Sequence, residues 1–149
     1  DYDLLCAQLK GLAEAERWYV PLLSNAAALL YDALENVNWA GFYLVRGEYL
    51  LLGPFQGKVA CVKIYKGKGV CGTAAAKKET VVVEDVECFP GHIACDPDSR
   101  SEIVVPLIAG GRCIGVLDID SNEKGRFGEA DREGLEAICR MLEKTVSES

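Results

Sequence analysis

The sequence predicts an α+β domain with a central, mostly antiparallel sheet of about six strands, flanked by helices at its N- and C-terminal ends. Apolar residues recur at helical spacing in the first 36 residues, and the C-terminal segment has the pattern of an amphipathic helix. Between them lie β-rich segments that are joined by hairpin turns. A length of 149 residues suits a single domain, 1–149, that buries roughly two thirds of its unfolded surface.

The terminal helices are predicted from apolar residues at helical spacing. The first stripe consists of Leu4, Leu5, Leu9 and Leu12. The second consists of Leu22, Leu23, Ala26, Leu29, Leu30 and Leu34, and Pro21 suits the first turn of its helix. In the C-terminal helix, 129–146, the residues expected to face the core are Leu135, Ile138, Cys139 and Leu142.

The middle of the chain has the residues and turns of β-hairpins. Strands are expected at 38–45, 48–55, 59–65, 80–86, 102–110 and 112–121. Arg46-Gly47 and Gly110-Gly111 are the hairpin signals. The glycines and small residues of 67–79 predict a tight turn into a short helix, with Cys71 near its start.

Charge and hydropathy exclude several classes of partner. The net charge of −7 argues against nucleic acid and against an anionic membrane, since either would need a basic face. The longest uncharged run, 18–31, is too short to span a bilayer. No basic region of a signal peptide opens the sequence, so we expect a cytoplasmic protein.

The seven cysteines do not form a recognisable framework. Their number is odd, there is no CxxC pair, and the chain has one histidine, so neither a disulfide scaffold nor a structural zinc site is expected. Cys6, Cys113 and Cys139 lie in apolar patterns and are expected to pack in the core. The others lie near loops or strand ends, where an oxidisable thiol in a reducing compartment tends to be catalytic or sensing.

Cys95 stands in the loop of "GHIACDPDSRSEIVVPL" (91–107), three residues after the only histidine, His92. Surface loops carry function, whereas an inert cysteine is usually buried. We expect His92 to shape this loop or to favour the thiolate. A Cys–His hydrolase is the alternative, but no third group that would orient the histidine is apparent.

An acidic strand follows this loop in the sequence. Asp118 and Asp120 are two residues apart and project from one face, while Leu117 and Ile119 occupy the other. A strict two-residue turn at 110–111 would set Glu102 opposite Ile119. A three-residue loop or a bulge would set it across from Asp118 or Asp120. The pattern leaves both registers open, and a solvated strand end remains the simpler alternative.

Convergence of the three carboxylates would create a site with its own chemistry. Like charges raise the pKa of at least one member, which leaves a protonated acid beside ionised neighbours. Such a site binds an ammonium group and donates a proton. A thiol beside it would suit reduction chemistry on a small amine.

Six motifs in order resemble the free methionine-(R)-sulfoxide reductases, which are small stand-alone GAF-domain enzymes. They are "NWAGFYL" (38–44), "GPFQGKVAC" (53–61), "GVCGTA" (69–74), "GHIACD" (91–96), "SEIVVPL" (101–107) and "IGVLDIDS" (114–121). The resemblance extends from about residue 24 to the C-terminal helix, and it implies the same antiparallel sheet flanked by helices.

The resemblance assigns roles to three cysteines. It implies that Cys95 is the nucleophile, that Cys61 is the resolving residue, and that Cys71 is an auxiliary or alternative partner. Cys88 fits no motif, but its nearness in sequence to Cys95 makes it a competing candidate for the resolving role.

The resemblance also implies a substrate pocket. Its carboxylates would be Glu102, Asp118 and Asp120, and Trp39 and Tyr43 would form the wall around the methyl-thio end of the substrate.

The implied reaction passes through a cysteine sulfenic acid and then an intramolecular disulfide. Thioredoxin would reduce that disulfide, drawing electrons indirectly from NADPH. No bound cofactor and no metal are expected.

Two other functions fit parts of the sequence. A GAF module that senses a small molecule needs a pocket but no chemistry, and a thiol redox sensor needs only accessible cysteines. Three carboxylates at a pocket favour the enzyme over the redox sensor. A homodimer is compatible with the sequence, which does not determine the oligomeric state.

Overall fold

The computed structural model describes residues 1–93 and 96–148. Its helices are α1 (Tyr2–Ala13), α2 (Tyr19–Ala33), α3 (Gly69–Lys77), the 3-10 turn η1 (Val86–Cys88) and α4 (Glu129–Glu148). Its strands are β1 (Val37–Arg46), β2 (Tyr49–Gly57), β3 (Lys63–Tyr65), β4 (Val81–Val83), β5 (Ser101–Ala109) and β6 (Arg112–Ser121).

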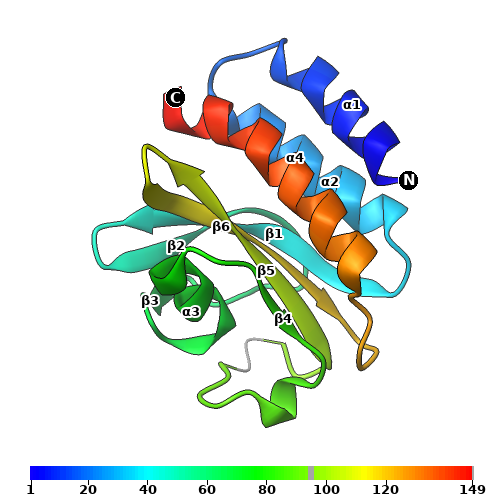
Figure 1. Cartoon of the computed structure of the whole chain (residues 1–149), viewed down its shortest axis with the longest axis vertical. Coiled ribbons are helices and arrows are strands. Elements are labelled where there is room, and N and C mark those ends of the chain that lie inside the picture. The colour runs from blue at the N-terminus through cyan, green and yellow to red at the C-terminus, as the bar shows by residue number, and fades with distance from the viewer. Residues whose placement is uncertain (94–95, 149) are drawn as a thin grey trace.

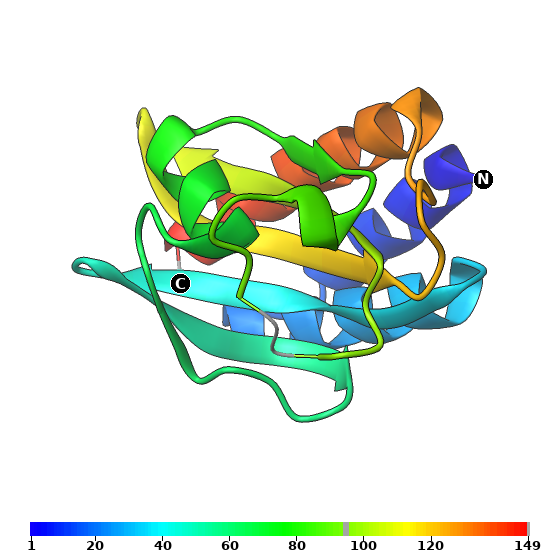
Figure 2. The same ribbon diagram turned by 90° about the horizontal axis from the view of Figure 1, so that it is seen from below.

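The strands form one antiparallel sheet in the order β3-β2-β1-β6-β5-β4. Helices α1, α2 and α4 lie together on one side of this sheet, and α3 lies on the other with the segments around η1 (Figure 1). The view from below shows the sheet between these two layers (Figure 2). The predicted α+β architecture is confirmed.

Alternation along the central strands produces two apolar clusters, one on each face of the sheet. Ile119 and Leu117 of β6 face α2 and α4 in the larger cluster. The intervening residues of the sheet face α3, and this smaller cluster includes Trp39, Tyr43 and Cys71. The second face carries the polar residues that the sequence singles out.

Helix α1 begins where Asp1 accepts hydrogen bonds from the backbone N–H groups of Asp3 and Leu4. Only part of its predicted stripe is buried. Leu5 and Leu9 enter the core, whereas Leu4 and Leu12 are 57% and 41% exposed. The prediction that all four leucines of this stripe are buried is therefore wrong for two of them. Helix α1 packs on α2 and α4 over a narrow face only.

Two expected strands are shorter in the structure. The expected strand 59–65 is reduced to Lys63–Tyr65, because the chain leaves the sheet after Gly57, whose φ of +130° few other residues adopt. The expected strand 80–86 is reduced to Val81–Val83, because Asp85 accepts a hydrogen bond from the Glu87 N–H and starts the 3-10 turn.

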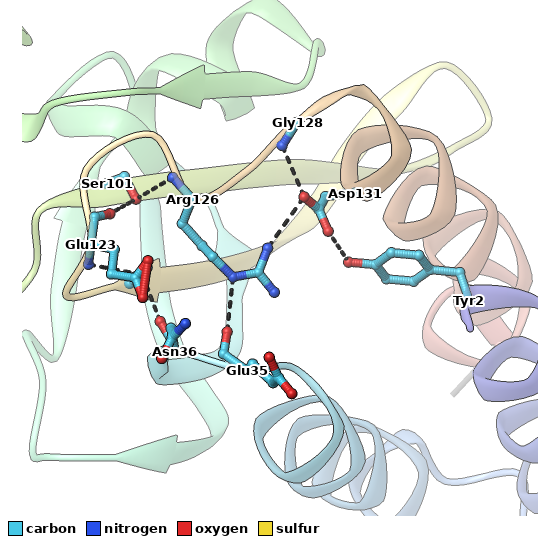
Figure 3. A network of polar contacts seen from close by, with 9 residues as sticks. Tyr2, Glu35, Asn36, Ser101, Glu123, Arg126, Gly128 and Asp131 are labelled. Atoms are coloured by element: carbon cyan, nitrogen blue, oxygen red, sulfur yellow. Dashed lines mark hydrogen bonds and ion pairs between the residues drawn. The ribbon is translucent and has the colours of Figure 1, made fainter.

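A polar network fixes the end of the sheet to the helical layer (Figure 3). Arg126 donates from Nε to the Glu35 carbonyl oxygen at 2.8 Å and from Nη1 to Asp131 at 3.3 Å. Asp131 also accepts from the Tyr2 hydroxyl at 2.6 Å. The Ser101 hydroxyl, at the start of β5, accepts from the Arg126 N–H at 3.4 Å, so the network reaches the residue beside Glu102.

Within the described residues, no helix has both the length and the apolar character needed to cross a membrane.

Candidate active site

The β5–β6 hairpin brings Glu102 to the acidic strand. Gly110 and Gly111 have φ of +58° and +75° and form a two-residue turn, so that Ala109 pairs with Arg112. The register then shifts by one residue between Ile108 and Leu107.

The shift pairs Leu107 with Gly115, which leaves Ile114 as the extra residue of a bulge. As a result Glu102 lies opposite Asp120, and Val104 lies opposite Asp118. Of the two registers that the sequence leaves open, the structure has the bulged one, and it places the three carboxyl groups on one face of the sheet.

These carboxyl groups are buried. Glu102, Asp118 and Asp120 are 6%, 6% and 9% exposed, so the alternative of a solvated strand end is wrong. Burial raises the pKa of all three carboxyls well above the usual range, and the charges of their neighbours in the cluster raise it further. The cluster therefore keeps its protons to a higher pH than exposed carboxyls do, and it can donate one.

Cys71 joins the carboxyl cluster from the first turn of α3, where the sequence predicts it. It is 4% exposed and lies in the same cavity as Glu102 and Asp118. Burial, followed by the charges of these carboxylates, raises the pKa of its thiol well above the ordinary value. Cys71 is thus a protonated thiol rather than an activated nucleophile in this form.

Trp39 and Tyr43 of β1 form the aromatic wall on the same face, with their ring centroids 6.0 Å apart. Trp39 also stacks on Phe55 at 5.2 Å. Their polar atoms hold the segment that carries Cys61. The Trp39 Nε1–H donates to the Lys58 carbonyl oxygen at 3.1 Å, and the Tyr43 hydroxyl donates to the Cys61 carbonyl oxygen at 2.8 Å.

Cys61 is half-buried and disulfide-bonded. Val59 and Ala60, directly before it, line the cavity. Cys95, the expected nucleophile, lies outside the described residues.

The described residues on both sides of Cys95 in the chain reach the same cavity. Ile93, Asp96 and Ser99 are among its lining residues, and so is His92. The His92 Nε2 lies 3.5 Å from Glu102 Oε1, and burial lowers the pKa of the imidazole. A neutral His92 therefore lies beside the carboxyl of Glu102.

Two residues that the sequence analysis did not single out tie this loop to the sheet. Asn38 donates from Nδ2 to Asp96 at 3.0 Å and to the Ser99 hydroxyl at 3.3 Å. Lys58 forms an ion pair of 2.7 Å with Asp98. Asn38 directly precedes Trp39 in the motif "NWAGFY", and this position identifies it from the sequence as a candidate residue of the site. The ion pair of Lys58 with Asp98, in contrast, cannot be predicted from the sequence around either residue.

The cavity between these walls has a volume of about 40 Å³. Its lining residues are Trp39, Tyr43, Val59, Ala60, Ile64, Lys68, Gly69, Val70, Cys71, His92, Ile93, Asp96, Ser99, Glu102, Asp118 and Asp120. This space suits roughly three water molecules. An amino acid with a side chain as long as that of methionine therefore needs the walls to move apart.

The remaining cysteines are free thiols outside this cavity. Cys113 and Cys139 are buried, and Cys6 packs against the core, as expected. Cys88 is exposed, with its Sγ 3.7 Å from Asp85 Oδ2.

Comparison with known proteins agrees with these observations. The family model described as "GAF domain" matches residues 5–146. The chain is 49% identical to the free methionine-R-sulfoxide reductase of Escherichia coli over 98% of its own length and 88% of that protein.

Two solved structures are similarly close. The free methionine-R-sulfoxide reductase of Neisseria meningitidis, in complex with its substrate, is 47% identical with a TM-score of 0.95, covering 99% of this chain and 89% of that one. The substrate complex of the Staphylococcus aureus protein is 51% identical with a TM-score of 0.92, covering 98% and 95%. The chain belongs to the free methionine-(R)-sulfoxide reductase family of GAF-domain proteins.

Proposed function

We propose that this chain reduces free L-methionine-(R)-sulfoxide to L-methionine. The observation that carries the proposal is the buried cluster of Glu102, Asp118 and Asp120 in a cavity that Cys71 and the residues flanking Cys95 also line. Relatives of nearly the same length, named for this activity, support the same substrate.

The carboxyl cluster suits the charged end of a free amino acid. With no lysine or arginine among the described residues paired to Glu102, Asp118 or Asp120, an ammonium group entering the cavity meets uncompensated carboxylates. Such charge-assisted hydrogen bonds are roughly twice as strong as neutral ones. The raised pKa values also leave a protonated carboxyl for the departing oxygen.

The reaction begins at the thiol of Cys95. Its sulfur attacks the sulfoxide sulfur, a carboxyl of the cluster protonates the sulfoxide oxygen, and that oxygen passes to the cysteine. Methionine leaves as the thioether, and Cys95 becomes a sulfenic acid, so the sulfoxide is reduced and the cysteine is oxidised by two electrons.

Cys61 then condenses with the sulfenic acid, which releases water and forms a disulfide. The disulfide-bonded state of Cys61 is consistent with this step. A dithiol protein such as thioredoxin, itself reduced with electrons from NADPH, returns both cysteines to thiols by exchange. All electrons pass through thiols, so the cycle needs no bound cofactor and no metal.

A single-turnover experiment tests the chemistry. The fully reduced protein, freed of reductant, is mixed with L-methionine-(R)-sulfoxide, and methionine and remaining thiols are counted. We expect one methionine per chain and the loss of two thiols. Cys95→Ser forms none, whereas Cys61→Ser forms one methionine and retains a sulfenic acid.

Cys6→Ser is the matched control, because Cys6 packs beside the core away from the cavity, and it behaves like the parent protein. Methionine formation by Cys95→Ser would overturn the assignment of the nucleophile. No methionine from the parent protein would instead favour a GAF module that only senses its ligand.

A further inference from the structure

Among the described residues, three that could bind a metal ion lie close together in the lining of the cavity. One ligand atom each from Cys71, Glu102 and Asp118 lies within 4.8 Å of the other two, and all three residues are buried. They come from α3, β5 and β6, so three different elements hold them. Zinc binds sulfur at about 2.3 Å and carboxylate oxygen at about 2.0–2.2 Å, so a small contraction of this triangle would accommodate it.

An unsatisfied atom points independently to a ligand at this place. Asp118 is 6% exposed, and its Oδ1 is fully buried without a hydrogen-bond partner among the described residues. A buried carboxylate oxygen normally has a donor, so this atom lacks a partner that a cation would supply.

The charge around the three ligands is also uncompensated. Among the described residues, no lysine or arginine forms an ion pair with a member of the cluster, and the nearest basic group is the neutral imidazole of His92, whose Nε2 lies 3.5 Å from Glu102 Oε1. Carboxylates that bind a metal are themselves commonly hydrogen-bonded by neighbouring groups. His92 is therefore placed to orient the carboxyl group of Glu102.

The size of the cavity distinguishes a metal from the amino acid substrate. About 40 Å³ is available in this disulfide-bonded form, which suits an ion with one or two waters but not free methionine sulfoxide. The mixed set of one sulfur and two oxygens suits zinc, because thiolate selects against magnesium and calcium. Three protein ligands and one water complete a tetrahedral site.

We propose that the oxidised form of this protein binds one Zn²⁺ through Cys71, Glu102 and Asp118, with His92 as a positioning residue. Binding releases to solvent the thiol proton of Cys71 and any proton that Glu102 or Asp118 carries. The ion would occupy carboxylates that the amino acid needs, so it acts as an inhibitor and not as a cofactor. This inhibitory consequence rests on the proposed function, whereas the binding itself does not.

Cobalt serves as the spectroscopic probe, since Co²⁺ occupies zinc sites and a thiolate ligand gives it a charge-transfer absorption in the near ultraviolet. The disulfide-bonded protein is titrated with cobalt chloride in the absence of reductant. We expect one Co²⁺ per chain, the thiolate absorption, and loss of that absorption when zinc chloride is added.

Variants assign the ligands. Cys71→Ser, which exchanges only the sulfur for the smaller oxygen, should abolish the thiolate absorption. Glu102→Gln and Asp118→Asn should each weaken Co²⁺ binding at least tenfold. Cys88→Ser is the matched control, because Cys88 is an exposed free thiol beside Asp85 and could bind cobalt at the surface. Circular dichroism verifies that each variant is folded.

The proposal is overturned if the parent protein gives no thiolate absorption up to millimolar cobalt. It is equally overturned if the absorption persists in folded Cys71→Ser or disappears in Cys88→Ser. None of these readings requires turnover, so a failure of the proposed reductase activity would be seen separately, in the single-turnover experiment.

Discussion

Glu102 and Asp120 face each other directly across β5 and β6, although the two-residue turn of their hairpin would by itself set Glu102 opposite Ile119. The one-residue bulge at Ile114 makes the difference, since it shifts the register of every pair beyond it. Because opposite residues share a face, both carboxyls lie beside Asp118 and away from the core formed by Ile119. The acidic site therefore depends on a single extra residue at the other end of the hairpin.

Neutralising the cluster should impair catalysis. Glu102→Gln, Asp118→Asn and Asp120→Asn each remove a proton donor or an anion from the cavity, and loss of a general acid costs about 10²–10⁴-fold in rate. We expect kcat/KM to fall within that range for at least one variant. The exposed Glu133→Gln of α4 is the control. If kcat/KM falls by less than about threefold in all three folded variants, the cluster has a structural role and no role in catalysis.

The stability of the protein should depend on pH through the same carboxyls. Their pKa values are raised in the folded chain above ordinary values of 3.8 and 4.5, so the native state keeps protons that the unfolded state loses. Their contribution to stability is fully present below these ordinary values and is lost as pH rises through the folded values.

We therefore expect the free energy of unfolding to fall between about pH 5 and about pH 8, by up to roughly 1.4 kcal/mol per pH unit for each proton. Asp118→Asn should make this dependence shallower, because one titrating group is removed. Urea unfolding at both pH values measures the effect. An identical slope in the parent and the variant would contradict the burial of an ionisable Asp118.

The aromatic wall depends on a glycine in β1. A Cβ on Gly41 would lie 2.3 Å from Phe55 Cβ and 2.8 Å from Trp39 Cη2, so Gly41→Ala must displace the stacked rings. We expect a loss of about 1–3 kcal/mol in the free energy of unfolding, typical of overpacking, together with a raised KM.

Gly11→Ala is the matched control for this substitution. A Cβ at Gly11 meets nothing within 4 Å, and the residue lies inside α1, so alanine should stabilise the protein by up to about 1 kcal/mol. Unchanged stability and KM in Gly41→Ala would show that the wall tolerates a shift of Trp39.

The charge of the amino group should decide which substrates are accepted. N-acetylation removes the ammonium charge at little cost in size and leaves buried carboxylates without a partner. We expect kcat/KM for N-acetyl-methionine-(R)-sulfoxide to be lower by more than about a hundredfold, or ~2.7 kcal/mol. Turnover within a few-fold of the free amino acid would show that the cluster does not bind the ammonium group.

The sequence predicts the elements of the sheet well because the pattern is local. Alternation in "GVLDIDS" places Leu117 and Ile119 in the core, and the glycines at 110 and 111 mark the turn. The sequence pattern leaves the register of β5 and β6 open, because a bulge depends on contacts across strands. Gly115 is a sequence signal of this bulge, because a glycine inside a strand often marks a bulge or a close approach of another backbone. In the structure, a Cβ at Gly115 would lie 2.8 Å from the Tyr43 carbonyl oxygen of the neighbouring strand.

The candidate site was predictable in its members but not in its full geometry. The motifs single out Glu102, Asp118 and Asp120, which the structure brings together. The convergence of Cys71 with these carboxylates depends on the packing of α3 against β5 and β6, which no spacing in the sequence shows. The zinc site proposed above leaves no short motif such as CxxC for the same reason, because its three ligands come from three different elements.

The central claim is that this chain reduces the free (R)-sulfoxide of methionine, and turnover of the two epimers tests it most directly. Oxidation of NADPH is followed in the presence of thioredoxin and thioredoxin reductase, with L-methionine-(R)-sulfoxide or the (S) epimer as substrate. A chiral cavity that must align the sulfoxide sulfur with one thiol predicts rapid NADPH oxidation with the (R) epimer and essentially none with the (S) epimer. Equal rates with both epimers, or no oxidation with either, would contradict the account.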